Sequence, residues 1–124
     1  MKPGDAFLFS YPAQKKHLMI IVCDSVSDDN DPMYHCVYVT TFRGTGFEDE
    51  ACMLNPGDHP FINRPSYIVY SRLLPITKNY LNRSLEIGSA TKMDPISSDL
   101  LIRIKRGAHH SKAIREIDKQ YFKL

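Results

Sequence analysis

Short apolar runs, separated by clusters of turn residues, dominate residues 1–90 and restrict the fold of this chain more than any other feature. The run 18–23 is continuously apolar and β-branched, which is typical of a strand buried on both faces, and the run 34–41 mixes aromatic and β-branched residues. We expect strands at residues 6–9, 18–23, 34–41, 51–54, 66–72 and 85–88, and a short edge segment at 74–77, where Pro75 excludes a central strand. Closely spaced strands without an intervening helical pattern indicate a small closed β-barrel rather than a parallel α/β sheet.

The C-terminal segment carries a helical pattern instead. Asp94-Pro95 is an N-cap followed by proline at the first helical position, Gly107 is expected to end this helix, and Ser111 is expected to cap a second one. The apolar stripes are Leu100, Leu101 and Ile104 in the first helix and Ile114, Ile117 and Tyr121 in the second. Both helices are too short to persist alone, so each must pack on the barrel or on a partner. We therefore predict a mainly β, α+β fold with one domain over residues 1–124, a barrel over about 3–90 and helices over about 95–122.

Composition favours a soluble single domain. The chain has 124 residues, of which 43% are hydrophobic and 24% are charged, enough for one core but not for two. No apolar run approaches the ~18 residues that a membrane span needs, and residues 1–5 lack the apolar core of a signal peptide. We therefore expect a cytoplasmic protein that does not associate with membranes.

The three cysteines indicate neither a disulfide framework nor a metal site. Cys23 and Cys36 lie within apolar runs, where cysteine usually acts as a small buried hydrophobe, and no Cys-x-x-Cys pair includes them or Cys52. The spacing typical of metal ligands is absent. The sequence therefore predicts no metal and no other cofactor.

The formal net charge of +2 hides an uneven distribution along the chain. Residues 1–71 carry five Lys or Arg against nine Asp or Glu, whereas residues 72–124 carry eleven against five. A basic C-terminal half suits an anionic partner such as nucleic acid. Lysines and arginines on solvated helix faces explain the same pattern equally well.

Three groups of polar residues stand where loops meet predicted strands, the usual position of functional sites. The first heads the second strand, the second follows the third strand, and the last joins the Gly57–Ile62 turn to the strand after it. Their members are Lys15, Lys16 and His17, then Thr40, Thr41 and Arg43, and finally His59 and Arg72. Because loops at one end of a small barrel converge, we expect these residues to line one groove.

These residue types suit RNA cleavage without a metal. The reaction needs a base to activate the 2′-hydroxyl, an acid to protonate the leaving oxygen, and cations or donors to hold the charge on the phosphorane. Histidine exchanges protons near neutral pH, and arginine offers a phosphate a fixed fork of donors. In the alternative interpretation, His59 only stabilises its turn, Arg72 is a solvated strand residue and Thr40-Thr41 is ordinary β-branched strand sequence.

Several of these segments, in the same order, resemble the MazF/PemK-like toxins of bacterial toxin–antitoxin systems. Family members begin with Gly-Asp and an apolar strand, continue with a polar loop and a strongly apolar strand, and end the third strand in a Thr or Ser pair. A later strand supplies polar site residues, and a C-terminal helix follows. The matching segments here are Gly4–Phe9, Lys16–Val22, Val37–Thr41 and Ser66–Arg72, and the Gly57–Ile62 motif is similar to one in divergent PemK-like proteins. The resemblance covers roughly residues 3–106.

The resemblance implies a small SH3-like β-barrel of the MazF/PemK/CcdB type, a homodimer, a cognate antitoxin, and a groove that cleaves single-stranded RNA or mRNA without a metal. The roles expected are base and acid for His59 or His17, phosphate clamp for Arg72 and Lys16, phosphate donor for Thr41, and further substrate contacts for Thr40 and Arg43. The family's Arg-Pro pair at the head of the second strand is replaced by Lys16-His17-Leu18, and its threonine or serine after the third strand corresponds to Thr40 or Thr41.

Two other functions remain open at this point. A non-catalytic barrel that binds nucleic acid or a protein is one, since small barrels host many functions. A toxin that poisons a protein target, as the gyrase-poisoning relatives of this family do, is the other. The second C-terminal helix resembles an extension that serves a partner.

Overall fold

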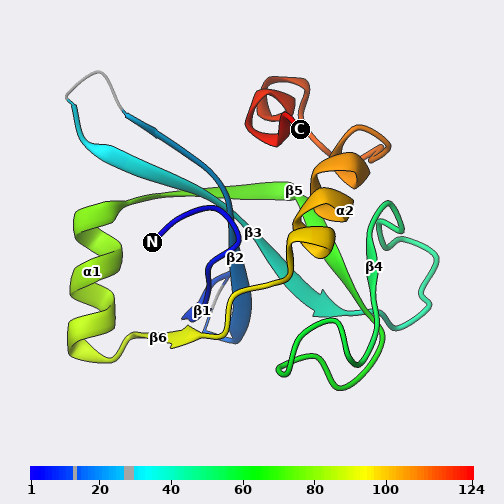
Figure 1. Cartoon of the computed structure of the whole chain (residues 1–124). Helices are drawn as coiled ribbons and strands as arrows, with labels where there is room; N and C mark the ends of the chain where they lie inside the picture. The colour runs from blue at the N-terminus through cyan, green and yellow to red at the C-terminus, as the bar shows by residue number, and fades with distance from the viewer. Residues whose placement is uncertain (13, 27–29) are drawn as a thin grey trace.

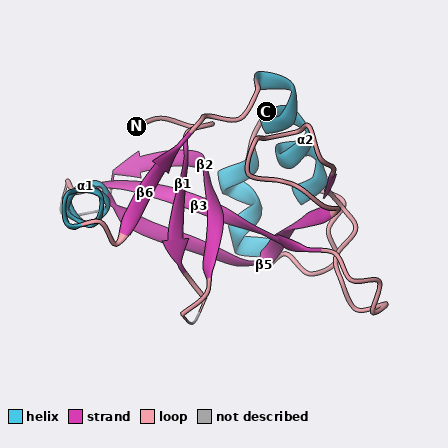
Figure 2. Cartoon of the chain, turned by 90° about the horizontal axis from the view of Figure 1, so that it is seen from below, coloured by secondary structure: helices cyan, strands magenta, loops and turns pink. Residues whose placement is uncertain are grey.

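The computed structural model describes residues 1–12, 14–26 and 30–124, and its core is one six-stranded antiparallel sheet in the order β4-β5-β3-β2-β1-β6. The strands are β1 (Ala6–Ser10), β2 (Lys16–Val26), β3 (Pro32–Thr41), β4 (Met53–Leu54), β5 (Ser66–Thr77) and β6 (Ala90–Met93). The helices are α1 (Lys78–Ile87), α2 (Ser98–Ala108) and the 3₁₀ helix η1 (Glu116–Phe122). The twisted sheet curls into a half-barrel, with α1 at one end and α2 at the other (Figures 1 and 2). Within the described residues no pairing joins β4 to β6, so the sheet forms an open half-barrel and not the closed barrel that the strand pattern predicts.

Apolar side chains on both faces explain why β2 and β3 lie in the middle of the sheet. Leu18 and Ile20 of β2 belong to a buried cluster that also contains Leu100 of α2. Met19, which alternates with them along the strand, belongs to a second cluster that contains Leu81 of α1. Each such side chain contributes ~1.5–3 kcal/mol when it is fully buried. The two clusters therefore hold one helix against each face.

The expected mainly β fold is confirmed, and the strands expected at 6–9, 18–23, 34–41, 51–54 and 66–72 correspond to β1 to β5. The edge segment expected at 74–77 is the continuation of β5. Pro75 fits there because it pairs with His35 of β3 on one side only. On the other side, β4 is too short to reach it and pairs only with Tyr67 and Ser66. Proline, which has no N–H to donate, therefore occupies an open edge.

The strand expected at 85–88 is wrong. Residues 85–87 form the last turn of α1, whose N-cap Thr77 accepts a hydrogen bond from the Tyr80 N–H at 3.1 Å. Gly88 ends the helix in the left-handed conformation, with φ of 83°, which glycine adopts without strain. The chain then forms β6, which pairs with β1 and which the strand pattern does not predict.

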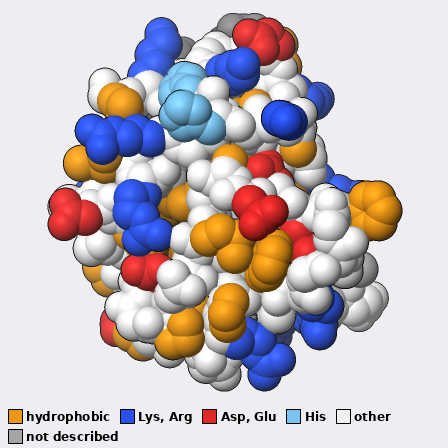
Figure 3. Space-filling model, turned by 90° about the vertical axis from the view of Figure 1, so that its right-hand side faces the viewer, with side chains coloured by type: hydrophobic (Ala, Val, Ile, Leu, Met, Phe, Trp, Pro, Cys, Tyr) orange, Lys and Arg blue, Asp and Glu red, His pale blue; other side chains and the backbone are white. Residues whose placement is uncertain are grey.

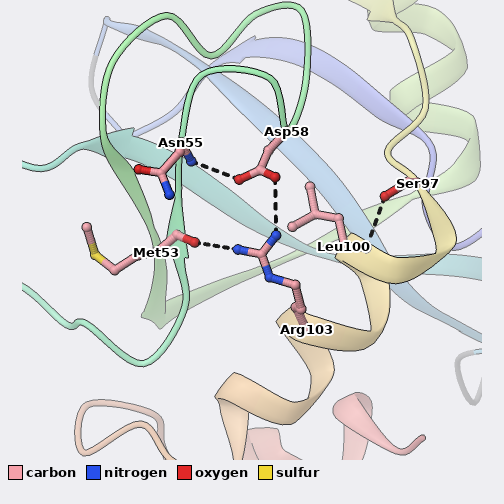
Figure 4. Close-up of polar contacts among 6 residues, drawn as sticks. All are labelled: Met53, Asn55, Asp58, Ser97, Leu100 and Arg103. Atoms are coloured by element: carbon pink, nitrogen blue, oxygen red, sulfur yellow. Dashed lines mark hydrogen bonds and ion pairs between the residues drawn. The ribbon is translucent and has the colours of Figure 1, made fainter.

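The first C-terminal helix is present, but both of its predicted ends are wrong. Ser97, not Asp94, is the N-cap of α2, and its Oγ accepts from the Leu100 N–H at 3.1 Å (Figure 4). At the other end α2 continues through Gly107 to Ala108. Gly107 does not end the helix. It is buried within α2, at a point where the helix lies against Tyr70 of β5.

The second C-terminal helix is the shorter 3₁₀ helix η1. A 3₁₀ helix has three residues per turn, so the side chains that face inward differ from those of an α-helix. Asp118 and Phe122 are buried, whereas Ile117, expected in the apolar stripe, is 66% exposed. Tyr121 stacks on the ring of His35, with ring centroids 3.8 Å apart. η1 thus packs on the same face of the sheet as α2.

Burial of His35 predicts a stability that depends on pH. Its Nε2 lies 2.8 Å from the Ser25 Oγ, and burial, which outweighs the nearby Asp118 carboxylate, lowers the pKa of His35 below its ordinary 6.5. The unfolded chain therefore binds more protons than the folded chain as the pH falls through 6.5. We expect the free energy of unfolding, measured with urea, to decrease as the pH is lowered from 7 to 5.

His35→Gln should flatten this dependence, whereas the matched change His110→Gln, at an exposed position, should leave it as it is. Part of the slope should remain in His35→Gln, because the pKa of His17 is lowered as well. Equal slopes for the wild type and His35→Gln would contradict the prediction.

Candidate functional site

The antiparallel pairing brings the ends of three strands to one edge of the sheet. β3 lies between β2 and β5, so its C-terminal end is beside the N-terminal ends of both neighbours. Thr41 pairs with Ser66 of β5, and Val39 pairs with Leu18 of β2. Three segments therefore meet at this edge: the residues before β2, the residues after β3 and the residues before β5 (Figure 1).

A pocket of about 330 Å³ lies where these segments meet. It is lined by Lys15, Lys16, His17, Val39, Thr40, Thr41, Arg43, Phe61, Ile62, Asn63, Arg64 and Ser66. The first two of the three groups predicted from the sequence are thus brought together, and this set of lining residues is called the basic pocket below.

Its lining carries charge of one sign. Lys15, Lys16, Arg43 and Arg64 are all exposed, and no Asp or Glu is among the described residues that line it. Hydroxyl and amide groups complete the polar part of the lining. Four cations around one opening raise the local concentration of anions, an effect that salt weakens. The basic pocket is therefore suited to a phosphate-bearing ligand.

Glu48 holds the segment that carries Arg43. Its carboxylate accepts hydrogen bonds from the backbone N–H groups of Arg43 at 2.6 Å and Thr45 at 2.8 Å. These hydrogen bonds lower the pKa of Glu48, and the one from the Arg43 N–H has the largest effect. The loop after β3 is thus tied through its backbone, and the Arg43 side chain remains exposed.

His17 is the pocket residue best suited to accept a proton. It is 8% exposed, its Nδ1 lies 3.2 Å from the Lys15 carbonyl oxygen, and its ring packs edge-on against Tyr38 with centroids 5.0 Å apart. Burial is the largest influence and lowers the pKa of His17, against the opposing effect of the Tyr11 and Lys15 carbonyls. The imidazole is therefore mainly neutral at pH 7, the form that a general base requires.

The third predicted group lies outside the basic pocket. His59 is 3% exposed: its Nε2 donates to the Asp94 carbonyl at 2.6 Å, and its Nδ1 accepts from the Phe61 N–H at 3.0 Å. Both ring nitrogens are thus engaged by the backbone. Arg72 is exposed on β5 and does not line the pocket. The convergence expected for all three groups therefore holds only for the first two.

Two anchors fix the loop that precedes β5, which forms one wall of the basic pocket. The guanidinium of Arg103 on α2 donates to the Asp58 carboxylate at 3.2 Å and to the Met53 carbonyl at 2.7 Å, and Asp58 also accepts from the Asn55 N–H at 2.8 Å (Figure 4). His59 supplies the second anchor through Asp94. The Gly57–Ile62 motif is therefore a positioning element for the pocket wall.

Sequence reasoning missed the contribution of this wall. Phe61, Asn63 and Arg64 line the basic pocket, although the sequence analysis assigns a site role to none of them. The signal in the sequence is an aromatic residue and an arginine in the loop before β5, a strand that also carries polar residues. Their approach to Lys16 and Thr41 depends on strand order, which the local sequence does not contain.

Comparison with known proteins identifies no relative. No family model, no curated protein and no solved structure matches the chain. The resemblance to MazF/PemK-like toxins therefore stays a prediction.

The described part of the chain has neither a membrane-spanning helix nor a group of metal ligands. It contains no helix that is both long and apolar enough to cross a membrane. The same described residues contain no group of three or more His, Cys, Asp or Glu that could hold a metal ion. On the side where β4 lies, basic, acidic and apolar side chains are interspersed (Figure 3). The uniformly positive charge is therefore a feature of the basic pocket, whereas the β4 side of the molecule carries charges of both signs.

Proposed function

We propose that this protein binds single-stranded RNA in the basic pocket and cleaves it there without a metal ion. The observation that carries the proposal is the meeting of four exposed cations, three hydroxyl side chains and one buried histidine in a pocket whose described lining residues include no carboxylate. The hydroxyl groups belong to Thr40, Thr41 and Ser66.

Binding follows from the charge of the lining. Each phosphate that pairs with a lysine or arginine releases condensed counterions, so affinity for a single strand falls with salt at a slope of ~0.7 per contact. Arg43 and Arg64 lie on different loops and can hold phosphates from two sides. Arginine is suited to this because its planar fork donates two parallel hydrogen bonds to phosphate oxygens.

Cleavage would proceed by transfer of the phosphate to the neighbouring ribose. His17 accepts the proton of the 2′-hydroxyl, the 2′-oxygen attacks phosphorus, and the bond to the 5′-oxygen breaks. The leaving 5′-oxygen takes a proton from a lysine ammonium, Lys15 or Lys16, so that a 2′,3′-cyclic phosphate and a 5′-hydroxyl remain. The arginines and Thr41 stabilise the extra charge on the phosphorane.

The cellular role in this proposal is that of a toxin with a cognate antitoxin, and the half-barrel would be a divergent SH3-like barrel that acts as a homodimer. The support is the resemblance to MazF/PemK-like toxins together with the mainly β fold and the C-terminal helix that it implies. Within that frame, Lys16 and His17 take the place of the family's Arg-Pro pair.

A second candidate is RNA binding without cleavage. It is favoured by the engagement of His17 with backbone carbonyls and by the position of His59 outside the pocket. Only one histidine is left in the pocket, so cleavage has to use a lysine as the second proton carrier. Incubation with a long RNA in EDTA separates the candidates. Discrete fragments with cyclic phosphate ends support the nuclease, whereas intact RNA with measurable affinity supports the binding protein.

Removal of pocket cations tests the binding step common to both candidates. Arg43→Gln and Arg64→Gln should each weaken RNA binding and reduce the slope of log Kd against log salt by ~0.7, as measured by fluorescence anisotropy. The matched control is Arg83→Gln, an exposed arginine on α1 that does not line the basic pocket. Equal losses in all three variants would show that attraction is general and not located at the pocket.

A further inference from the structure

We infer that the segment Phe61–Arg64 is the base-recognition wall of the basic pocket, with Phe61 stacking on one unpaired base and Asn63 hydrogen-bonding to its edge. The inference rests on the proposed RNA binding and adds to it the part of the RNA that is read. It does not depend on cleavage.

The position of Phe61 is the first argument. Phe61 is 42% exposed and lines a pocket that carries four cations. Single-strand binding sites combine a basic track for the backbone with aromatic rings on which bases stack, each worth a large share of the affinity. Phe61 and the four cations place both components around one opening.

The rigidity of the wall is the second argument. The Phe61 N–H donates to the His59 Nδ1 at 3.0 Å, and the Ile62 N–H donates to the His59 carbonyl at 2.9 Å. His59 is itself bonded to the Asp94 carbonyl, and the Asp58–Arg103 pair ties the same loop to α2. The backbone under the ring is therefore fixed before a ligand arrives, which lowers the entropy lost on binding.

Asn63 supplies the polar part of the wall. Its Oδ1 accepts from the Arg64 Nε at 3.4 Å, and its NH₂ group can donate to a base. Asparagine forms paired donor and acceptor contacts with base edges when a base is unstacked. A volume of about 330 Å³ is at the small end of the ~300–1,000 Å³ typical of ligand pockets. The size of the basic pocket is therefore that of a small-ligand site, which suits recognition of a single unstacked base.

The test compares two labelled ligands by fluorescence anisotropy: a single-stranded RNA of ten uridines and a ribose-phosphate oligomer of the same length without bases. Phe61→Leu should raise the Kd for the RNA by about 5- to 150-fold, the range of aromatic stacking on one base. Its Kd for the abasic oligomer should stay within about twofold of the wild type. Arg64→Gln should weaken binding to both ligands.

Phe47→Leu is the matched control, because Phe47 is 96% exposed and lies outside the basic pocket. It should change neither Kd. If Phe61→Leu has no effect, or weakens both ligands equally, the base-recognition role is overturned while RNA binding stands. If the wild type binds neither ligand, the proposed function itself is overturned.

Asn63→Ala should bring the Kd values for homo-oligomers of the four RNA bases closer together. An unchanged spread of these Kd values would overturn the role of Asn63 in base recognition.

Discussion

Replacing His17 with asparagine should slow RNA cleavage by ~10²–10⁴-fold, the usual contribution of a positioned acid or base. The asparagine amide can keep the hydrogen bond to the Lys15 carbonyl that His17 makes through Nδ1, but it cannot accept a proton at neutral pH. RNA affinity should change by less than about threefold, because the pocket cations remain. The measurement is the rate of fragment formation under single-turnover conditions in EDTA.

The pH dependence gives an independent readout of the same role. Because burial lowers the pKa of His17 below its ordinary 6.5, the wild-type rate should rise with pH below that value and be level around pH 7. His110→Asn, a change at an exposed histidine outside the basic pocket, serves as the control and should leave both rate and profile unchanged. A wild-type rate in His17→Asn would mean that another group removes the proton.

Replacing Gly107 with alanine should lower the free energy of unfolding by ~1–3 kcal/mol, the cost of overpacking a filled core. In an exposed helix the same change stabilises by ~1 kcal/mol, so the sign is the informative result. A Cβ at this position would lie 2.5 Å from the Tyr70 hydroxyl oxygen and 2.9 Å from the Ala51 carbonyl oxygen. The Tyr70 hydroxyl cannot withdraw freely, because it donates to the Ile104 carbonyl at 2.6 Å within the core.

A double-mutant cycle identifies the clash as the cause. Tyr70→Phe removes the closest atom, so Gly107→Ala should cost less in the Tyr70→Phe background than in the wild type. Arg106→Ala, at the exposed neighbouring position, should change stability by less than about 0.5 kcal/mol. Chemical unfolding at pH 7 measures all four variants. An increase in stability for Gly107→Ala would show that α2 can move away from the sheet.

The sequence located β1 to β5 because strand signals are local. Continuous or alternating apolar residues, bounded by turns, identify a strand without reference to its neighbours. The strand prediction for 85–88 is wrong for the same reason, since a short apolar run does not distinguish a strand from the end of a helix. Leu81, buried on the sheet, and the Thr77 cap determine that this segment belongs to α1.

The candidate site could likewise be predicted from the sequence only in part. Lys16, His17, Thr40, Thr41 and Arg43 could be grouped beforehand, because loops at the ends of neighbouring strands converge in any small barrel. The residue types of His59 and Arg72 were equally suitable, yet residue type does not reveal which way a side chain faces. His59 faces the backbone of Asp94, thirty-five positions further along the chain, and so anchors the loop and does not line the pocket.

For this protein, the sequence by itself determined a mainly β fold, the approximate positions of β1 to β5 and the chemistry available at their ends. These properties depend on residue type and on periodicity over a few neighbouring positions. Only the tertiary structure decided that Gly107 is a contact point and not a helix end, that His59 is an anchor, and that Phe61 and Arg64 complete the basic pocket. Each of these depends on contacts between segments far apart in the chain, and such contacts are set by strand order and packing.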